Sequence, residues 1–530
     1  MRIGELDRAG DAELTADVCV IGSGPAGITV ASELAGSGLA VLVLESGGRQ
    51  EDPADEELND YDNAGAARAT PLQSARNRML GGSTHTWSGR CGYFDDIDYA
   101  PRSWVPDSGW PIGAAELRPY LDRGARHLGL GPGSGFNDDA FWALAGRARP
   151  AGELDAELLR PYFWQISRDP VDRFDCLRLG PHLAERTAPG VRVLLHATVT
   201  HLTTDPAGGR VHEVEVTGAD GRVRIVRAQR FVLAAGGIEN ARLLLASRRI
   251  VPAGVGNRHD RVGRYLMDHR CGVVATLGPT GDVGRFGKYV VRTAQGSHTF
   301  LHGVALSEAI QRREELLNCA LWFQEVPSAD DPWDSVKRLL RGRGDRHDLR
   351  RAVADAGLLA RGARRRLFQH TGLPRRLDRI ELRCMLEQPP DPDSRITLSE
   401  RTDRLGQPVA RIDWRTHPAE DRTARRAAGL AVAEFARLGC PAPELADWAR
   451  PGSELAVPLT DWAHPTGATR MSSDPRHGVV DVNCRVHGVE NLYIAGSSVF
   501  PTAGHANPTL TAVALAVRLA DTLKALSGRS

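Results

Sequence analysis

The stretch Val18-Cys19-Val20-Ile21-Gly22-Ser23-Gly24-Pro25-Ala26-Gly27 decides the fold of the N-terminal part of this 530-residue chain. Its first four residues are small or β-branched and apolar, which is typical of a buried strand. The glycines that follow have the spacing GxGxxG, in which Gly22 permits a tight turn, Gly24 lets backbone approach a pyrophosphate, and Gly27 lets a helix pack on the strand. We therefore predict a strand, turn and helix of the doubly wound α/β type.

The residues after this turn complete a dinucleotide-binding pattern. A helix is expected to about Gly36, Ala40–Leu44 reads as a second apolar strand, and Glu45 follows as the acid that accepts ribose hydroxyls. Glycine turns also join many strands to helices without any ligand, but here five elements agree in register. FAD and NAD both remain open from this unit alone, whereas Glu45 disfavours the 2′-phosphate of NADP.

The C-terminal end carries a second set of polar residues. Asn491–Gly496 reads as a short strand ending in glycine, and a long apolar helix runs to about Leu526. Asn507 is expected to cap that helix and Pro508 to be its first residue. The positive end of the helix dipole can stabilise negative charge on a bound group.

At this point the sequence resembles the glucose–methanol–choline (GMC) oxidoreductase family. The resemblance rests on ordered blocks at residues 22–27, 81–84, 234–242, 262–269, 464–467 and 507–509. The block around Gly236 and the phrase at residues 506–511 are most similar to the pyranose oxidase branch and its bacterial relatives, which oxidise sugars, sugar acids or glycosides. The chain as a whole is expected to be an α/β protein, with a Rossmann-like FAD-binding domain and a substrate domain built on an antiparallel sheet plus helices.

The resemblance assigns catalytic roles to two residues. It implies that His464 takes the proton of the substrate hydroxyl as hydride leaves for flavin N5, and that Asn507 occupies the second position of the pair. Neutral imidazole suits a base at working pH, and Asn507 can hold the substrate oxygen without titrating. The simpler alternatives are a loop histidine bonded to backbone and an ordinary helix cap, and Asn507 can serve both purposes.

Further residues are expected around the cofactor and the substrate. His505 either contacts a sugar hydroxyl or packs against the flavin edge, and Thr86 or Trp87 is expected to line the reactive face of the flavin. Thr86 stands where relatives with covalent flavin have histidine, and His85 lies one residue earlier, so non-covalent FAD is expected. The cofactor-binding set implied by the resemblance is Gly22, Gly24, Gly27, Glu45, Gly81, Gly82, Ser83, Val199, Ala235, Gly236, Gly496, Pro508 and Thr509.

The domains are expected to be discontinuous. The FAD-binding domain is predicted from residues 1–100, 190–265 and 455–530, and the substrate domain from residues 101–189 and 266–454. Within them we expect strands at Val191–Val199, Phe231–Ala235, Glu381–Glu387, Arg395–Leu398 and Val409–Trp414, and a helix at Ile238–Ser247. Gln388 is expected to face solvent, as glutamine commonly does, and the alternative is that it faces the substrate.

Residues 331–380 stand out for charge, with 14 Lys or Arg against 6 Asp, a net charge of +8. Leucines recur there at roughly helical spacing, so amphipathic helices are predicted. Such a segment is usually a solvated face, and the alternatives are a cover over the pocket mouth, an oligomer contact or a dock for an electron acceptor.

Composition narrows the functional classes. A net charge of +1 gives no general attraction to nucleic acid or membrane, and no apolar run reaches the ~18 residues of a spanning helix. Residues 1–18 lack the apolar core of a secretion signal, so a cytoplasmic enzyme is expected. The eight cysteines form no CxxC pair, so neither a zinc site nor an iron–sulfur cluster is indicated, and no metal is expected.

The leading hypothesis is FAD-dependent oxidation of a secondary alcohol, at C2 or C3 of a pyranose or glycoside, with His464 as base and reoxidation by O2. A dehydrogenase that passes electrons to a quinone or protein partner is the first alternative, and a non-redox lyase that keeps FAD as structure is the second. The exact substrate, the oxidised carbon, the acceptor and the oligomeric state cannot be read from the residues.

Overall fold

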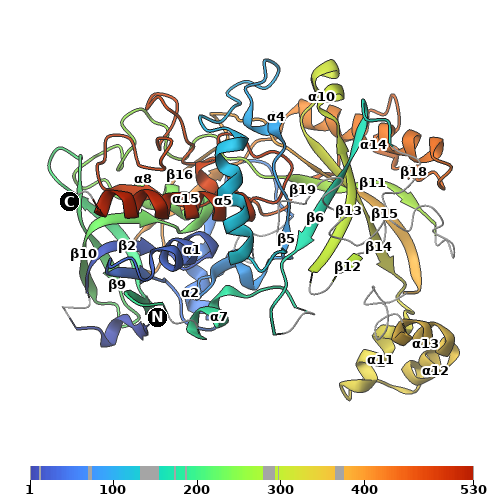
Figure 1. The fold of residues 1–530 in the computed structure, drawn as a ribbon, viewed down its shortest axis with the longest axis horizontal. Coiled ribbons are helices and arrows are strands. Elements are labelled where there is room, and N and C mark those ends of the chain that lie inside the picture. The colour runs from blue at the N-terminus through green and yellow to red at the C-terminus, as the bar shows by residue number, and fades with distance from the viewer. Residues whose placement is uncertain are drawn as a thin grey trace.

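The computed structural model describes residues 2–10, 14–69, 75–131, 154–171, 175–185, 188–278, 293–295, 298–364 and 375–528. Two bodies lie side by side in Figure 1, an α/β body that contains both ends of the described chain and a body dominated by long strands. The chain passes between them several times.

The α/β body is organised around an eight-stranded sheet. The strands in spatial order are β1 (Arg2–Glu5), β7 (Val191–Leu195), β3 (Val41–Leu44), β2 (Thr15–Ile21), β10 (Val223–Leu233), β9 (Val211–Thr217) and β8 (Thr198–Thr204), with β20 (Leu492–Ile494) also pairing with β10. The β1, β7, β3, β2, β10 and β20 pairings are parallel, whereas β9 joins β10 and β8 by antiparallel pairing. The α/β class expected from the first glycine turn is therefore present.

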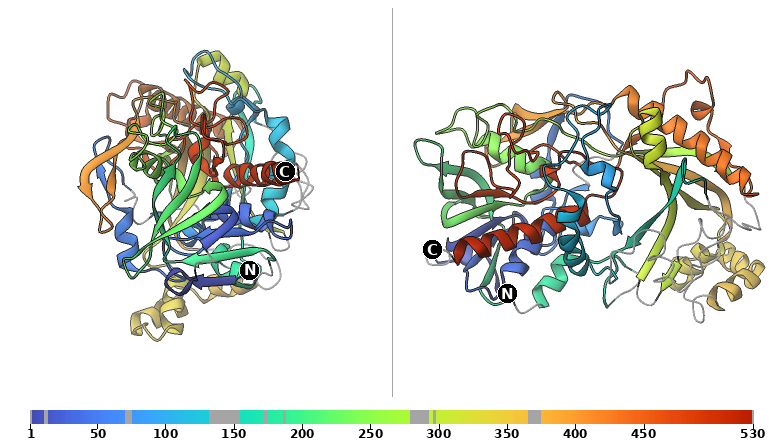
Figure 2. Two further views of the ribbon diagram at one scale, coloured as in Figure 1. Left: turned by 90° about the vertical axis from the view of Figure 1, so that its left-hand side faces the viewer. Right: turned by 45° about the horizontal axis from the view of Figure 1, so that its top comes forward.

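The central strands β3 and β2 are apolar because most of their residues are buried. All four residues of β3 are buried, and Val18, Cys19 and Val20 of β2 have no exposed surface. Parallel strands covered on both faces lack the alternation of polar and apolar residues. Helix α1 (Pro25–Leu34) contacts β2 and β3, and α15 (Thr509–Ser527) packs against both α1 and α5 (Ala114–His127). Figure 2 shows α15 crossing the body beside α1.

The second body is an antiparallel sheet of nine strands. Its order is β18 (Glu444–Leu445), β11 (Arg270–Leu277), β15 (Leu377–Leu386), β14 (Cys319–Pro327), β13 (His298–Leu306), β6 (Leu159–Ile166) and β5 (Arg90–Cys91), with β12 (Thr293–Gln295) on β13 and β19 (Thr460–Asp461) on β11. Helix α14 (Pro418–Arg437) packs on this sheet. Strands β5 and β19 come from ranges that the sequence places in the FAD-binding domain, so the sheet takes strands from both.

A small third sheet contains β16 (Arg395–Thr402), β17 (Pro408–Asp413) and β4 (Tyr61–Asn63). The two predicted strands near residues 395 and 409 therefore do not join the large antiparallel sheet. Ile396, Ala410 and Ile412 are fully buried in the core of the α/β body, beside helix α8 (Gly236–Ala246), whereas Ile380 and Leu382 of β15 belong to the other core. Burial of the hairpin's apolar face against α8 decides its place.

The predicted strand Val191–Val199 is wrong in its extent. His196 has a φ of +50°, and this left-handed residue divides the segment into β7 and β8. The two pieces have different partners, because β7 lies between β1 and β3 while β8 pairs with β9. Short α-helices also lie at α2 (Pro53–Glu56), α4 (Asp96–Tyr99), α7 (Leu179–Glu185) and α10 (Glu308–Glu314).

The basic segment forms helices, as predicted, over its described part. Helices α11 (Pro332–Leu340), α12 (Arg346–Ala354) and α13 (Ala356–Arg364) pack on one another and project away from the large sheet in Figure 1. Their exposed apolar residues are Leu340, Leu349 and Val353. Residues 365–374 of the segment lie outside the described chain. Among the described residues, no helix has the length and apolar character needed to cross a membrane.

The first glycine turn depends on close backbone contact. Gly22 has a φ of +106°, and a Cβ placed on Gly27 would lie 2.0 Å from the carbonyl oxygen of Gly22. Gly24 differs, because its φ is −68° and no atom lies within 4 Å of the position of a Cβ. Gly27 therefore serves packing, and Gly24 leaves open space beside the turn.

Replacing Gly27 by Ala should lower the free energy of unfolding by about 1–3 kcal/mol, because the new methyl group overpacks a rigid backbone contact. Gly24→Ala is the matched control and should unfold at nearly the wild-type denaturant concentration. Urea unfolding of the flavin-free proteins measures both values. Equal stabilities for the two variants would contradict this account of the turn.

Candidate active site

A cavity of about 540 Å³ lies where the first glycine turn meets the C-terminal segment. Most of the residues predicted for the cofactor and the chemistry line it. These are Gly22, Gly24, Glu45, Gly82, Ser83, Thr86, Val199, Ala235, Gly236, His464, Gly496, Asn507, Pro508 and Thr509. Residues more than 480 positions apart in the chain thus face one space.

Gly27, Gly81 and His505 are predicted site residues that lie outside the cavity lining. Gly27 packs on the turn as described above. Gly81 has a φ of +100°, and a Cβ there would lie 2.5 Å from the backbone nitrogen of Gly180. Both glycines therefore shape backbone that carries other lining residues.

Glu45 is held beside the turn by three donors. Its Oε2 accepts hydrogen bonds from the Ser23 backbone N–H at 2.9 Å and the Ser23 hydroxyl at 2.5 Å, and its Oε1 accepts from Gly47 N–H at 3.1 Å. Burial raises the pKa of Glu45, and these hydrogen bonds act in the opposite direction. The carboxylate is therefore fixed at the end of β3, where the dinucleotide pattern places the acid that accepts ribose hydroxyls.

An ion cluster that the sequence analysis missed borders the same end of the cavity. Arg76 and Arg78 each pair with one oxygen of Glu239, at 2.8 and 3.0 Å, and all three residues line the cavity. Burial opposes ionisation of Glu239, but Arg242, Arg78 and Arg76 hold its pKa at about 2. Glu239 and Arg242 lie within a recognised block, whereas nothing in the pattern around Arg76 marks it.

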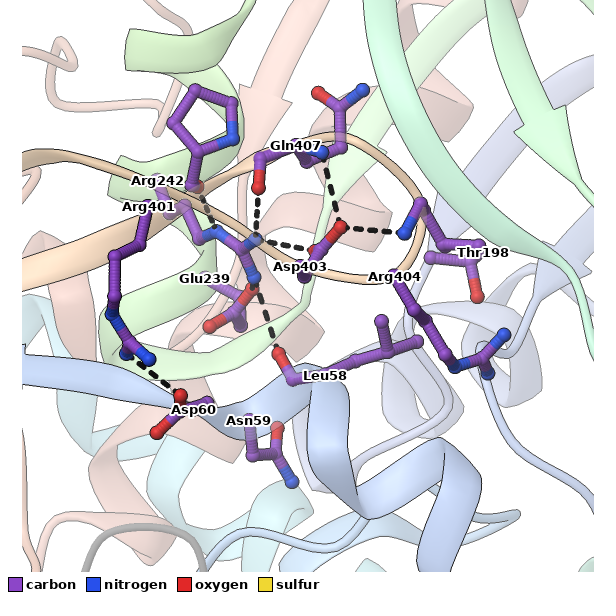
Figure 3. A network of polar contacts seen from close by, with 12 residues as sticks. Leu58, Asn59, Asp60, Thr198, Glu239, Arg242, Arg401, Asp403, Arg404 and Gln407 are labelled. Atoms are coloured by element: carbon purple, nitrogen blue, oxygen red, sulfur yellow. Dashed lines mark hydrogen bonds and ion pairs between the residues drawn. The ribbon is translucent and has the colours of Figure 1, made fainter.

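Arg242 connects this cluster to the small third sheet. Its Nη2 lies 2.6 Å from Asp403 Oδ2, its Nε donates to the Pro408 carbonyl at 2.8 Å, and its Nη1 donates to the Leu58 carbonyl at 3.2 Å. Figure 3 shows the guanidinium between the β16–β17 turn and the segment around Leu58. These contacts fix α8 and thereby the Ala235–Gly236 edge of the cavity.

His464 lies between two polar side chains. Its Nδ1 is 2.9 Å from Nδ1 of His269, and its Nε2 is 3.4 Å from Nδ2 of Asn507. His464 is half-buried, His269 has no exposed surface, and Oδ1 of Asn507 is buried without a hydrogen-bond partner. The structure therefore brings the two predicted catalytic residues together and adds a second histidine.

The surroundings keep His464 neutral. Burial first, and then His269 and Arg90, lower its pKa to about 3, while Asp268 acts in the opposite direction. An imidazole with this pKa is unprotonated at neutral pH and has a free lone pair. His464 can therefore accept a proton on whichever ring nitrogen carries that lone pair.

The position of Asn507 corrects the expected start of the last helix. Helix α15 begins at Thr509 with Pro508 in the cap position, and the Pro508 carbonyl accepts from Ala512 N–H at 2.9 Å. No side-chain hydrogen bond caps this helix, so the side chain of Asn507 does not serve as the predicted cap. It points toward His464 instead.

His505 lies behind the cavity. The ring has no exposed surface, packs edge-on against Tyr162 with centroids 4.6 Å apart, and places Nε2 3.4 Å from Asp95 Oδ2. The side chain of His505 turns into the core between Tyr162 and Asp95. This geometry does not support the expected contact of His505 with a substrate hydroxyl.

The segment after Gly81 is compact. Residues Gly82–His85 form a 3₁₀ helix, and Nε2 of His85 bonds to the Leu80 carbonyl at 2.9 Å. Thr86 lines the cavity and donates to Asn77 Oδ1 at 2.9 Å. His85 is thus directed to backbone while Thr86 faces the cavity.

Aromatic and cationic residues complete the lining near His464. Trp87, Arg90 and Trp462 line the cavity. The Arg90 guanidinium lies 4.6 Å over the Trp322 ring, and Trp87 Nε1 donates to the Leu177 carbonyl at 3.0 Å. Arg90 and Trp462 were missed by sequence reasoning, because a single arginine or tryptophan has no spacing signal. Among the described residues, no cluster of His, Cys, Asp or Glu suited to a metal ion occurs, and all eight cysteines are free.

Known oxidoreductases resemble this chain in sequence. Residues 390–516 match a family model described as GMC oxidoreductase. Paromamine 6′-oxidase from Streptomyces fradiae is 28% identical over 97% of this chain and 91% of its own length. C-glycoside 3-oxidase from Microbacterium trichothecenolyticum is 26% identical over 95% of each chain, and the fructose dehydrogenase large subunit from Gluconobacter japonicus is 23% identical over 96% of this chain and 98% of its own.

Solved structures agree in fold. Pyridoxine 4-oxidase superposes with a TM-score of 0.57 at 19% identity, covering 96% of this chain and 98% of that one, and a formate oxidase superposes with a TM-score of 0.58 at 17% identity, covering 97% and 99%. Residues 390–516 therefore form a GMC oxidoreductase domain, and the chain as a whole resembles enzymes of this type in sequence and fold.

Proposed function

We propose that the protein is an FAD-dependent oxidase that converts a CH–OH group of a pyranose sugar or glycoside to a carbonyl, with His464 as the base. The observation that carries the proposal is the pairing of His464 Nε2 with the Asn507 amide, 3.4 Å apart, in the same cavity as the dinucleotide turn. A neutral base, a non-titrating polar partner and a dinucleotide cradle are the parts that alcohol oxidation requires.

The cavity fits FAD, the cofactor implied by the family. Gly24 and Gly236 both line it, and neither has an atom within 4 Å of the position of a Cβ. The N-terminus of α1 would hold the pyrophosphate and Glu45 the ribose, while Pro508 and Thr509 bring the N-terminus of α15 to the cavity. When bound, FAD supplies the acceptor for the hydride.

The chain's own residues then have defined tasks. His464 removes the proton from the substrate hydroxyl, and Asn507 holds the oxygen without changing charge. Arg90, which lines the cavity and lowers the pKa of His464, favours negative charge on the substrate oxygen as the proton leaves.

The names of the relatives support a sugar-like substrate. Two are oxidases named for paromamine and for 6‴-hydroxyparomomycin C, and a third is named a C-glycoside 3-oxidase. These names include oxidation at a 6-position and at a 3-position. Candidate substrates therefore include primary hydroxyls as well as the secondary hydroxyls at C2 and C3. Trp87 and Trp462 offer apolar surface on which a sugar ring can pack.

Dehydrogenase activity is the second candidate. The fructose dehydrogenase large subunit and 2-methyl-1,2-propanediol dehydrogenase also align with nearly the whole chain. An oxidase and a dehydrogenase would differ in the electron acceptor, O2 in the first and another molecule in the second. The acceptor can be tested separately from the substrate.

The test is the visible spectrum of the purified protein under argon, with monosaccharides, cyclitols, aminoglycosides and aryl glycosides added one at a time. Bleaching of the flavin band by one class identifies the substrate, and recovery of the band in air with formation of H2O2 supports the oxidase. Turnover that is equal in air and argon with an artificial acceptor would instead favour the dehydrogenase. A flavin band that no alcohol bleaches would contradict the proposal and favour a non-redox role.

Replacing His464 by Ala should slow substrate-driven flavin reduction by about 100- to 10,000-fold, because general-base assistance is lost. Stopped-flow absorbance under argon measures the rate. His212→Ala, at an exposed position on β9, is the matched control and should reduce at the wild-type rate. A His464→Ala rate within about threefold of wild type would exclude His464 as the base.

The flavin should be non-covalent, since His85 is held by the Leu80 carbonyl and Thr86 faces the cavity. Acid precipitation of the protein is therefore expected to leave all of the yellow colour in the supernatant. His85→Ala should bind the same amount of flavin as the wild type. Colour that remains in the precipitated wild-type protein would show a covalent link.

A further inference from the structure

We propose that His269 is a positioning residue that fixes the tautomer of His464, so that the hydrogen of His464 stays on Nδ1 and the lone pair of Nε2 faces the cavity. This inference rests on the proposed role of His464 as base. It assigns a function to a buried histidine that does not line the cavity itself.

The tautomer of His269 follows from its contact with the backbone. Its Nε2 lies 3.4 Å from the backbone carbonyl oxygen of Ala503, and a carbonyl can only accept a hydrogen bond. Nε2 of His269 therefore carries the hydrogen. Burial lowers the pKa of His269, so the ring is neutral and its Nδ1 is left as an acceptor.

The tautomer of His269 in turn determines that of His464. The two Nδ1 atoms are 2.9 Å apart, and the ring planes are inclined by 84°. Two lone pairs cannot form a hydrogen bond, so Nδ1 of His464 must be the donor. A neutral imidazole has one N–H, and Nε2 of His464 is therefore the unprotonated nitrogen.

The contact between His464 and Asn507 at the cavity fits this tautomer. Nε2 of His464 lies 3.4 Å from the Asn507 amide nitrogen, which is a donor and so matches a lone pair on Nε2. A substrate hydroxyl placed at Nε2 would meet an acceptor and not a second N–H. The tautomer set by the Ala503 carbonyl is thus the one that can remove a proton.

The backbone holds the two rings at the required distance. Oδ1 of Asp268 accepts from the N–H of His269 at 2.7 Å and from the N–H of His464 at 2.9 Å. The chain segments that carry the two histidines therefore share one anchor. Neither backbone segment can move away without breaking a hydrogen bond to a buried carboxylate.

The alternative is that His269 only fills space beside His464. The pair of variants His269→Leu and His269→Asn separates the two roles. Leucine fills much of the ring's volume but offers no acceptor, whereas the asparagine oxygen can take the place of Nδ1. Flavin content and thermal unfolding identify which variants are correctly folded before any rate is compared.

The decisive measurement is ¹⁵N NMR of the holoenzyme labelled in its histidines, with the His464 signals identified by their loss in His464→Ala. In the wild type we expect a protonated Nδ1 and an unprotonated Nε2 at neutral pH. His269→Leu should give a mixture of tautomers, and His269→Asn should retain the wild-type form. A wild-type His464 with its hydrogen on Nε2 would overturn the proposal even if neither variant folds.

Kinetics supply an independent readout. With the substrate found above, His269→Leu should lower kcat about 10- to 100-fold with a smaller change in KM, and His269→Asn should restore most of the loss. Removing His269 also removes one cause of the low pKa of His464, so the acid limb of the rate profile should move to higher pH in His269→Leu. Equal losses in both variants with an unchanged pH profile would reduce His269 to a packing residue. Full activity in His464→Ala would instead overturn the proposed base while leaving the tautomer result standing.

Discussion

The buried carboxylate of Asp268 is the interaction on which the rest of the site depends. Its Oδ1 accepts from the backbone N–H groups of His269, His464 and Trp462, at 2.7, 2.9 and 3.3 Å, and its Oδ2 pairs with Arg68 at 2.8 Å. Burial opposes its ionisation, but Arg68 and His464 keep the pKa of Asp268 below its usual range. Removing one partner of such a buried pair costs about 3–5 kcal/mol, because the other charge is left uncompensated. The same carboxylate therefore stabilises the junction of the two bodies and places both histidines.

The cofactor side of the cavity follows from the sheet. Ile21 of β2 and Ile494 of β20 both pair with Leu233 of β10 in parallel register, so the three strands end at one edge. The residues that follow them are Gly22, Ala234–Gly236 and Gly496, and all of these line the cavity. Ligands of open α/β sheets bind beyond the carboxyl ends of the strands. Register thus brings together glycines that are hundreds of residues apart in the chain.

The parts of the fold that the sequence predicts are those set by local rules. Gly22, Gly24 and Gly27 specify a turn whose geometry depends only on neighbouring backbone, and the helices of the basic segment follow from their own periodicity. The errors arise where distant contacts decide. His196 breaks a strand because its two halves pair with different partners, and the β16–β17 hairpin joins the α/β core because its apolar face packs on α8.

The candidate site shows the same division. A paired sequence motif identified His464 and Asn507. No motif indicated the direction of the buried side chains that surround them. Gln388 was expected to face solvent, yet it is buried, with its Oε1 accepting from Asp268 N–H and from Trp414 Nε1, each at 2.8 Å. His505 was placed near the substrate by its distance in sequence from Asn507, but its ring packs on Tyr162. A side chain's direction depends on neighbours from other elements, which spacing along the chain does not reveal.

The low pKa of His464 creates a requirement that the fold meets. Burial keeps the imidazole unprotonated at neutral pH, but it also disfavours the imidazolium that would form once a proton has moved to the ring. The proton can be held at His464 only where negative charge offsets that cost. Asp268 is the fixed negative charge beside the ring, and it is the one group among the causes of the shift that raises the pKa of His464. The carboxylate that fixes the histidines in space therefore also stabilises the protonated state that His464 would enter in its proposed role as base.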